Sequence, residues 1–206
     1  GNGARCVGDL LLTQSGKPSI ALSTPGGLIR CSREPDGRVT VDMGEPKLDW
    51  QDIPLSEKFH DTRYIDLHVG PVDAPLIDRP SVVNVGNPHA VFFVADSDAV
   101  DLERLGPLIE HDPLFPARVN VNVATLVDRR TIRLRVFERG AGETLACGTG
   151  ACAAVVSGIL RGLLDARVTV ATRGGDLVIV WAGAGQPVLM TGPAVTVFEG
   201  EIEIPH

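Results

Sequence analysis

The chain has 206 residues, of which 44% are hydrophobic and 22% are charged, and its 19 basic and 26 acidic residues give a net charge of −7. This composition is that of a globular chain with enough apolar residues for one large core or two small ones. The acidic balance argues against nucleic-acid and anionic-membrane partners, and no apolar run approaches the roughly 18 residues of a membrane span.

Short β-branched or alternating apolar runs, bounded by Gly and Pro, predict strands along most of the chain. In chain order they are residues 19–24, 28–32, 38–43, 64–69, 82–85, 90–94, 119–127, 131–138, 167–172, 176–181, 188–191 and 194–198. Apolar residues at helical spacing predict a helix over 98–111, limited or kinked by Pro107. Residues 150–164 are apolar almost all round, which predicts a helix buried inside the sheet. Residues 44–62 are polar and aperiodic, and we expect a linker there.

Three short motifs recur in the same order in two parts of the chain. Residues 1–4 match residues 148–151, residues 24–27 match 172–175, and residues 43–46 resemble 190–193. Between these landmarks both copies predict a helix, a strand, a Gly-Gly turn and two further strands. We therefore expect two related halves that face each other.

The first residue is Gly1, and the only methionines are Met43 and Met190. This is not a natural translation start, so we expect that residues upstream of Gly1 are absent. The register of the repeat predicts that a cysteine, the counterpart of Cys147, directly precedes Gly1. No charged-then-apolar segment opens the chain, which predicts no export signal and a reducing compartment.

Cys147 stands directly before Gly148-Thr149-Gly150, where the predicted buried helix begins. Backbone N–H groups at a helix N-terminus lack partners, and the helix dipole favours negative charge there. This setting predicts a thiol of lowered pKa beside an anion-binding turn. Gly1-Asn2-Gly3 predicts a second turn of the same kind. Two such turns across a cleft suit the removal of a proton from one face of a carbon next to a carboxylate and its return to the other.

Other interpretations of these glycines are close packing around a core cysteine and a G-x-G-x-x-A dinucleotide turn. A dinucleotide turn needs an apolar strand directly before it, which residues 143–146 are not. Pyridoxal phosphate needs a Schiff-base lysine, and Lys17, Lys47 and Lys58 all lie away from the Gly-rich turns. We therefore expect no cofactor.

The cysteines do not predict a metal site. Cys147 and Cys152 lie five residues apart with no histidine nearby, and this spacing does not suit a tetrahedral metal site. Cys6, Cys31 and Cys152 are expected to be core thiols.

Polar residues also occur at two predicted strands. Gly86-Asn87-Pro88-His89 lies between two strand patterns, either as a plain turn or with Asn87 and His89 facing a cleft. Asn120 and Asn122 share one face of a predicted strand, where a core would be apolar. Either asparagine alone is more typical of a turn or a strand edge.

Taken together, the motifs resemble the diaminopimelate epimerase family. The resemblance covers essentially the whole chain and rests on residues 1–6, 86–89, 138–144 (Glu-Arg-Gly-Ala-Gly-Glu-Thr), 146–153 (Ala-Cys-Gly-Thr-Gly-Ala-Cys-Ala) and 190–194. It implies an α+β fold of two pseudo-symmetric domains, each a curved mixed sheet or barrel around a central apolar helix. It also implies a cofactor-independent, cytoplasmic homodimer that interconverts LL- and meso-diaminopimelate in lysine and cell-wall synthesis.

The resemblance also implies roles for individual residues. Cys147 corresponds to one of two catalytic thiols, and Glu138 and His89 are implied in tuning the thiol pair. Arg139 suits the distal carboxylate of the substrate and Glu138 an ammonium group. The implied substrate-binding residues are Gly1, Asn2, Asn87, Asn120, Glu138, Arg139, Gly148 and Thr149.

In this family the other catalytic cysteine directly precedes Gly-Asn-Gly, and no residue precedes Gly1 in this sequence. We therefore expect residues 1–45 and 193–206 to be the remnant of an N-terminal domain that lacks about 70 residues. Residues 46–192 are expected to be a complete C-terminal domain, and the chain alone is expected to be inactive. A proline or hydroxyproline racemase-like enzyme and a non-catalytic binding module remain as alternatives; Glu138 and Arg139 argue against a cyclic imino acid.

Overall fold

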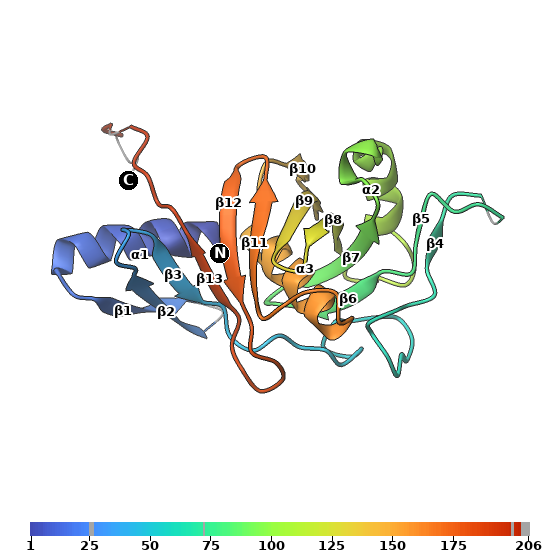
Figure 1. Ribbon diagram of the computed structural model, residues 1–206, viewed down its shortest axis with the longest axis horizontal. Helices are drawn as coiled ribbons and strands as arrows, with labels where there is room; N and C mark the ends of the chain where they lie inside the picture. Colours follow the sequence, from blue (N-terminus) through green and yellow to red (C-terminus); the bar gives the residue numbers. More distant parts are fainter. Residues whose placement is uncertain (25–26, 72, 199, 203–206) are drawn as a thin grey trace.

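The structure is a computed structural model that describes residues 1–24, 27–71, 73–198 and 200–202 (Figure 1). Its helices are α1 (Asn2–Ser15), α2 (Leu102–Glu110) and α3 (Gly148–Leu160), with a 3₁₀ turn η1 (Ser97–Ala99). The first strands are β1 (Ser19–Thr24), β2 (Gly27–Arg33), β3 (Val39–Asp42), β4 (His68–Val69), β5 (Ile77–Asp78), β6 (Ser81–Asn84) and β7 (Pro88–Val94). They are followed by β8 (Asn120–Asp128), β9 (Thr131–Glu138), β10 (Gly142–Thr144), β11 (Arg167–Thr172), β12 (Gly175–Val180) and β13 (Leu189–Gly192).

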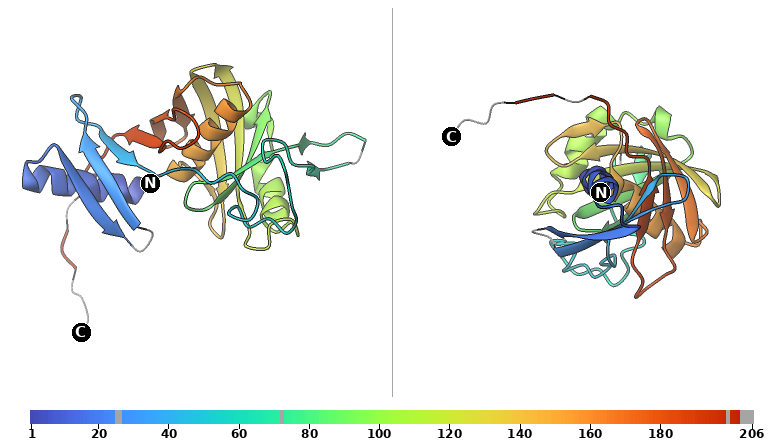
Figure 2. Two further views of the ribbon diagram at one scale, coloured as in Figure 1. Left: turned by 90° about the horizontal axis from the view of Figure 1, so that it is seen from below. Right: turned by 90° about the vertical axis from the view of Figure 1, so that its left-hand side faces the viewer.

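One mixed sheet has eleven strands; its part from β6 to β9 with β12 and β13 curls around α3, whereas β1 to β3 lie against α1 (Figure 2). Its order is β1-β2-β3-β13-β12-β11-β9-β8-β7-β6, and β10 pairs with β9. The pairs β7–β8 and β9–β11 are parallel and the remaining pairs are antiparallel. The strands β4 and β5 form a separate arm that projects from the body (Figure 1). The predicted α+β class, a curved mixed sheet around an apolar helix, is confirmed.

The central helix α3 is buried because its residues are small and apolar. Residues 150–158 are all buried, and the helix contacts strands β6 to β9 as well as β12 and β13. It begins at Gly148, earlier than expected, and ends at Leu160, before Gly162 adopts a positive φ of 71°. This burial fixes where the N-terminus of α3, with Cys147, lies in the fold.

A second hydrophobic cluster packs α2 against the other face of β7 and β8. Ile53 and Leu55 belong to this cluster and are buried. As expected for a linker, residues 44–62 form no helix or strand apart from an isolated bridge at Lys47. Because Ile53 and Leu55 are buried, however, this segment packs against the body of the protein.

The predicted repeat is present as two copies of a helix followed by three strands. The first copy is α1-β1-β2-β3 and the second is α3-β11-β12-β13. The last strands of the two copies pair antiparallel, with Val41 opposite Met190 and Asp42 opposite Leu189. Antiparallel pairing of equivalent strands relates the copies by a local, approximate twofold rotation. Within the first Gly-Gly turn, residues 25 and 26 lie outside the described residues, as do residue 199 and residues 203–206 of the expected C-terminal remnant.

Three predicted elements were wrong. Residues 194–198 leave the body without forming a strand (Figure 1), since they pair with no strand in the described part of the chain. The strand expected over 64–69 is only the short β4, His68–Val69. The helix expected over 98–111 is divided, because Asp96 accepts a hydrogen bond from the Asp98 N–H and starts η1, whereas Asp101 accepts one from the Arg104 N–H and starts α2.

The expectation that Cys6 is a core thiol was also wrong. Helix α1 buries Gly8 and Leu12 but leaves Cys6 exposed, together with Val7, Leu10 and Leu11. In the described residues, the side of α1 toward β1, β2 and β3 is the one that is covered, and Gly8 lies directly against Cys31 there.

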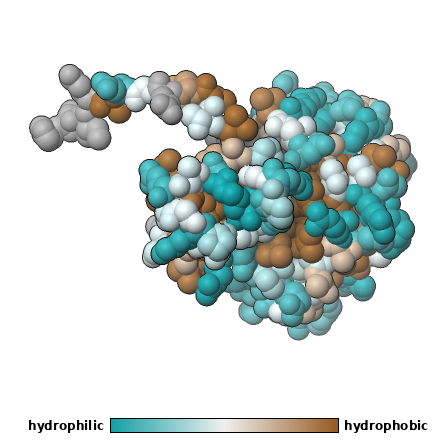
Figure 3. Space-filling view, turned by 60° about the vertical axis from the view of Figure 1, so that its left-hand side comes forward, coloured by the Kyte–Doolittle hydropathy of each residue, from teal (hydrophilic) through white to brown (hydrophobic). Residues whose placement is uncertain are grey.

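Figure 3, which brings the left-hand side of Figure 1 forward, shows hydrophobic side chains in a hollow ringed by hydrophilic ones. Within the described ranges, no helix combines the length and the apolar character needed to traverse a bilayer.

Candidate functional site

The N-termini of the two equivalent helices meet at Gly1 and Gly148. A Cβ atom on Gly1 would lie 3.2 Å from the Gly148 Cα, and one on Gly148 would lie 3.3 Å from the Gly1 Cα. The Asn2 side-chain amide reaches the Ala146 carbonyl at 3.5 Å. No side chain caps either helix N-terminus. The backbones therefore approach closely only because both residues are glycine, and two partial positive charges lie side by side.

Cys147 is the N-cap residue of α3 and is 5% exposed. Its Sγ lies 3.2 Å from Oε2 of Glu138 and 3.4 Å from the Thr149 hydroxyl. Burial raises the pKa of the Cys147 thiol, and hydrogen bonds from Thr149 and the Gly150 N–H offset this only in part. The sequence predicted a lowered pKa from the helix N-terminus. That prediction was wrong for this structure, because the loss of solvent outweighs the helix end.

Glu138 ends β9 and connects Cys147 to β10. Its Oε1 accepts a hydrogen bond of 2.6 Å from the Thr144 hydroxyl, and its Oε2 accepts the one from Cys147. The two oxygens of this carboxylate therefore have different partners. Such a carboxylate can accept the proton of the neighbouring thiol or bind a substrate ammonium group.

His89 is fully buried, and both ring nitrogens have partners. Nε2 lies 2.9 Å from Oδ1 of Asn87, and Nδ1 lies 3.1 Å from Nδ2 of Asn122. An amide nitrogen donates and an amide oxygen accepts, so the ring carries its proton on Nε2. Burial lowers the pKa of His89 to about 3, and the positive charge of Arg139 contributes in the same direction. His89 is thus a neutral ring that fixes the Asn87 amide.

Asn122 is a buried member of this arrangement that sequence reasoning did not select. Its Nδ2 donates to His89 and to the carbonyls of Ala90 and Asn120, whereas its Oδ1 has no hydrogen-bond partner in the described part of the chain. Its alternation with Asn120 along one strand was the available signal.

Asn120 and Arg139 are adjacent, but their side chains bind the backbone. Asn120 donates to the Pro88 carbonyl and accepts from the Arg139 N–H. The exposed Arg139 guanidinium donates to the Ala117 carbonyl at 2.8 Å. Asn120 therefore joins the starts of β7 and β8 to the end of β9. The Arg139 guanidinium has to release the Ala117 carbonyl before all of its N–H groups can bind a ligand.

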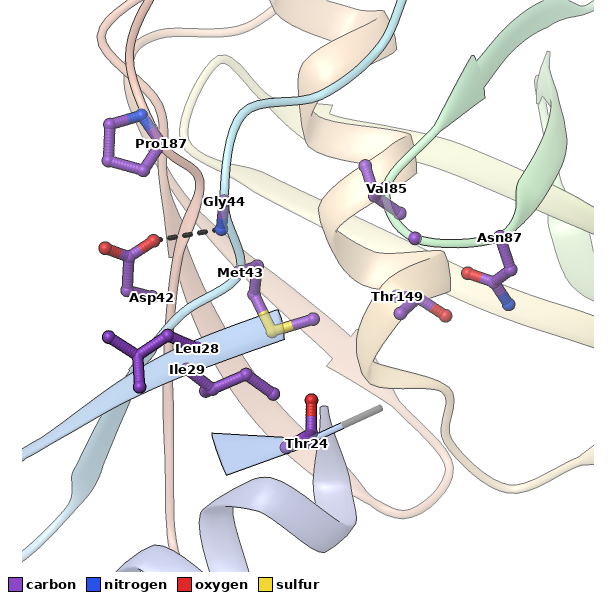
Figure 4. A pocket seen from close by; sticks show the side chains of 11 residues that line it. Thr24, Leu28, Ile29, Asp42, Met43, Gly44, Val85, Asn87, Thr149 and Pro187 are labelled. Carbon is purple, nitrogen blue, oxygen red and sulfur yellow. Dashed lines mark hydrogen bonds between the residues drawn. The ribbon is translucent and has the colours of Figure 1, made fainter. Parts of the chain in front are cut away.

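A cavity of about 680 Å³ opens between the two copies of the repeat. Thr24, Ile29 and Met43 line it from the first copy, and Thr149 lines it from α3 (Figure 4). Asn87 lies beside Thr149 on the same wall. Cys147, Glu138 and His89 are not among its lining residues; they lie behind or beside those that are. In the described ranges no cluster of three His, Cys, Asp or Glu side chains is arranged to hold a metal ion.

Gly150 tests how closely α3 fits the site. A Cβ there would lie 2.5 Å from Oδ1 of the fully buried Asn122 and 3.3 Å from the Cys147 Cβ. We expect Gly150→Ala to lower the free energy of unfolding by about 1–3 kcal/mol in urea denaturation, because the buried amide has no room to move. Gly3 is the equivalent residue of α1 and has nothing within 4 Å of its would-be Cβ. As the control, Gly3→Ala should leave stability unchanged or raise it by up to about 1 kcal/mol; equal effects of the two would contradict this account.

The chain is similar to known proteins along nearly all of its length. A family model described as diaminopimelate epimerase matches residues 81–197. The diaminopimelate epimerase of Afipia carboxidovorans is 52% identical over 201 residues, which is 97% of this chain and 69% of that protein. The diaminopimelate epimerase of Rhodopseudomonas palustris is 50% identical over 204 residues, which is 98% of this chain and 70% of that protein.

Two solved structures share the fold at low sequence identity. A probable proline racemase from Agrobacterium radiobacter, with bound carbonate, superposes with a TM-score of 0.66 at 19% identity and covers 100% of this chain and 68% of its own. A phenazine biosynthesis protein of the PhzF family from Bacillus anthracis superposes with a TM-score of 0.57 at 15% identity, covering 94% of this chain and 73% of its own. Both are similar to this chain in fold.

Proposed function

Because the chain belongs to the diaminopimelate epimerase family and is an isomerase, we propose that it interconverts LL- and meso-diaminopimelate. This reaction serves lysine and peptidoglycan precursor synthesis. The observation that carries this proposal is the thiol of Cys147, held by Glu138 where two helix N-termini meet. A thiol and an anion-binding turn together supply a base and a place for the carboxylate next to the reacting carbon.

The proposed reaction moves one proton off the α-carbon and another onto it. Cys147 first gives its proton to Glu138, and the thiolate then takes the α-proton, so that the electron pair of the broken C–H bond spreads into the neighbouring carboxylate. Backbone N–H groups of the two turns, Gly1-Asn2 and Gly148-Thr149, stabilise that growing negative charge. A second thiol, expected directly before Gly1, returns a proton to the opposite face and is left as a thiolate. The starting state is restored when the proton held by Glu138 passes through solvent to that thiolate. No cofactor takes part.

The far end of the substrate would be bound by Asn87, which lines the cavity, and by side chains that lie beyond its described lining. Arg139 is proposed for the distal carboxylate, Asn87 and Asn120 for further polar contacts, and Glu138 for an ammonium group. His89 supports the site by holding Asn87. Because Asn120 and Arg139 bind backbone groups in this structure, the proposal includes a rearrangement of Arg139 when substrate arrives.

The domain division is proposed as well: residues 1–45 with 193–206 on one side, and residues 46–192 on the other. The β3–β13 pairing supports an intimate junction between the two parts. We also propose a cytoplasmic homodimer, which light scattering of the purified protein would test.

The substrate is tested by offering LL-diaminopimelate and L-proline separately to the protein as its gene encodes it. We expect conversion of LL- to meso-diaminopimelate and no racemisation of proline, because Glu138 and Arg139 suit a second amino-carboxylate end. Turnover of proline or hydroxyproline alone would favour the racemase-like alternative. Tight binding of an amino acid without turnover would favour a binding module.

A polypeptide of these 206 residues alone should not sustain epimerisation, because it holds a single thiol, Cys147, at the meeting of the helices. In D₂O it should at most exchange the α-proton of one stereoisomer, which proton NMR can follow. Sustained formation of meso-diaminopimelate by this polypeptide would contradict the two-thiol mechanism.

A further inference from the structure

The short strand β10 presents alternate side chains to two different partners on β9. Gly142 pairs with Glu138, Glu143 with Phe137 and Thr144 with Val136. Successive side chains of a strand point to opposite faces, and each can reach diagonally to the residue two positions along its partner strand. Thr144 thus reaches Glu138 on one face, at 2.6 Å, and Glu143 reaches Arg135 on the other.

The Glu143 face fastens β10 to the body of the protein. Arg135 donates to both oxygens of Glu143, at 2.9 and 3.0 Å, and the two side chains are only 10% and 11% exposed. The same guanidinium donates to the carbonyls of Ser97 and Val100, at 2.7 and 2.8 Å. Arg173 adds a contact of 2.9 Å to Glu143. A bidentate and largely buried ion pair of this kind is geometrically specific. It therefore sets the position of β10 and with it that of Thr144.

The Thr144 face meets the carboxylate beside the thiol. Glu138 receives a side-chain hydrogen bond at each oxygen: from Thr144 at Oε1 and from Cys147 at Oε2. A hydroxyl has one proton to donate. When that proton is given to Oε1, Oε2 is the oxygen that faces the thiol.

We propose that Thr144 is a positioning residue for the reaction: its hydroxyl holds Oε1 of Glu138, so that Oε2 is aimed at the Cys147 thiol, and the Arg135–Glu143 pair holds Thr144 in place. The inference rests on the proposed function, in which Glu138 receives the thiol proton. Thr144 acts through Glu138.

The test compares Thr144→Val, which keeps the shape and removes the hydroxyl, with Thr144→Ser, which keeps the hydroxyl. Both are made in the protein as its gene encodes it. We expect Thr144→Val to lower kcat by about 10- to 100-fold with a much smaller change in KM, since misdirecting a catalytic group is costly. Thr144→Ser should restore most of kcat. Thr169→Val is the matched control, because that half-buried strand hydroxyl makes no hydrogen bond to the described part of the chain.

A second readout is independent of turnover. The contact with Glu138 raises the pKa of the Cys147 thiol. The pH dependence of Cys147 alkylation by iodoacetamide, followed by peptide mass spectrometry, should therefore shift to lower pH in Thr144→Val, where Oε2 is no longer aimed at the thiol, but not in Thr144→Ser or Thr169→Val. An unchanged or raised midpoint in Thr144→Val overturns the inference, as does equal loss of kcat in the Val and Ser variants. If the variants show this alkylation pattern but the wild-type protein epimerises no amino acid, the proposed function is refuted. The inference that Thr144 positions Glu138 then still stands.

Discussion

Cys147→Ser is expected to lower kcat for the epimerisation of diaminopimelate by about 10³-fold or more, with the fold intact. The substitution keeps the size and the hydrogen bond to Glu138, but a serine hydroxyl is far less acidic than a thiol and does not form the base that takes the α-proton. The measurement is conversion of LL- to meso-diaminopimelate by the protein as its gene encodes it, with circular dichroism to verify folding.

Cys6→Ser is the matched control for that experiment. Cys6 lies on α1, near the other helix N-terminus, but its side chain is exposed and serves no role in the proposed chemistry. Its replacement should leave kcat within about twofold, because serine keeps the size of the side chain and Cys6 takes no part in the proposed chemistry. Full activity in Cys147→Ser, or equal losses in both variants, would exclude Cys147 as the base.

Stability should fall steeply with decreasing pH because of His89. Burial holds the pKa of the folded-state ring at about 3, whereas the pKa of an unperturbed imidazole is 6.5. The unfolded chain therefore binds a proton that the folded protein does not, between these two values. Stability is complete above pH 6.5 and is lost by about 1.4 kcal/mol per pH unit as the pH falls toward 3. By pH 4 the loss from this one side chain reaches about 3 kcal/mol.

Urea unfolding of wild type and His89→Gln between pH 4 and 7 isolates this contribution. Whatever its free energy of unfolding at pH 7, the variant should lose less stability on acidification, by the stated amount, because glutamine does not titrate. The exposed His60 provides the control, and His60→Gln should keep the wild-type pH dependence. An NMR titration of the folded protein in which the His89 ring protonates near pH 6 would contradict the account.

The features that the sequence predicted well are local ones. Cys147 was expected at the start of a buried helix from its Gly-x-Gly turn, and it is the N-cap residue of α3. The repeat was visible because each copy needs the same turns at the same places, and α1 and α3 each lead into a hairpin and a further strand. Most strands were found because alternation and bounding glycines are themselves local signals.

The features that were missed depend on which distant segments pack together. The pKa of Cys147 follows from burial by strands far away in sequence, which overrides the local effect of the helix end. Asn122 reaches His89 only because β7 and β8 pair in parallel, with His89 opposite Asn120. Cys6 is exposed although it lies in an apolar helix, because the side of α1 on which it lies has no neighbouring element in the described residues. The alternation of Asn122 with Asn120 is a local signal for a polar strand face, but the partner of Asn122, the burial of Cys147 and the exposure of Cys6 have no signature in the neighbouring residues.

The antiparallel pairing of β3 with β13 also has a stereochemical consequence. A planar carbon has two faces that are mirror images, and a protein built from L-residues and right-handed helices has no mirror-image copy of itself to offer the second face. A twofold rotation about an axis lying in the plane of that carbon nevertheless exchanges its faces. Two copies of one motif, related by such a rotation, can therefore present the same thiol and helix end from both sides. With the second thiol of the proposed function, both configurations of the substrate carbon would be reached by a protein whose own handedness does not change.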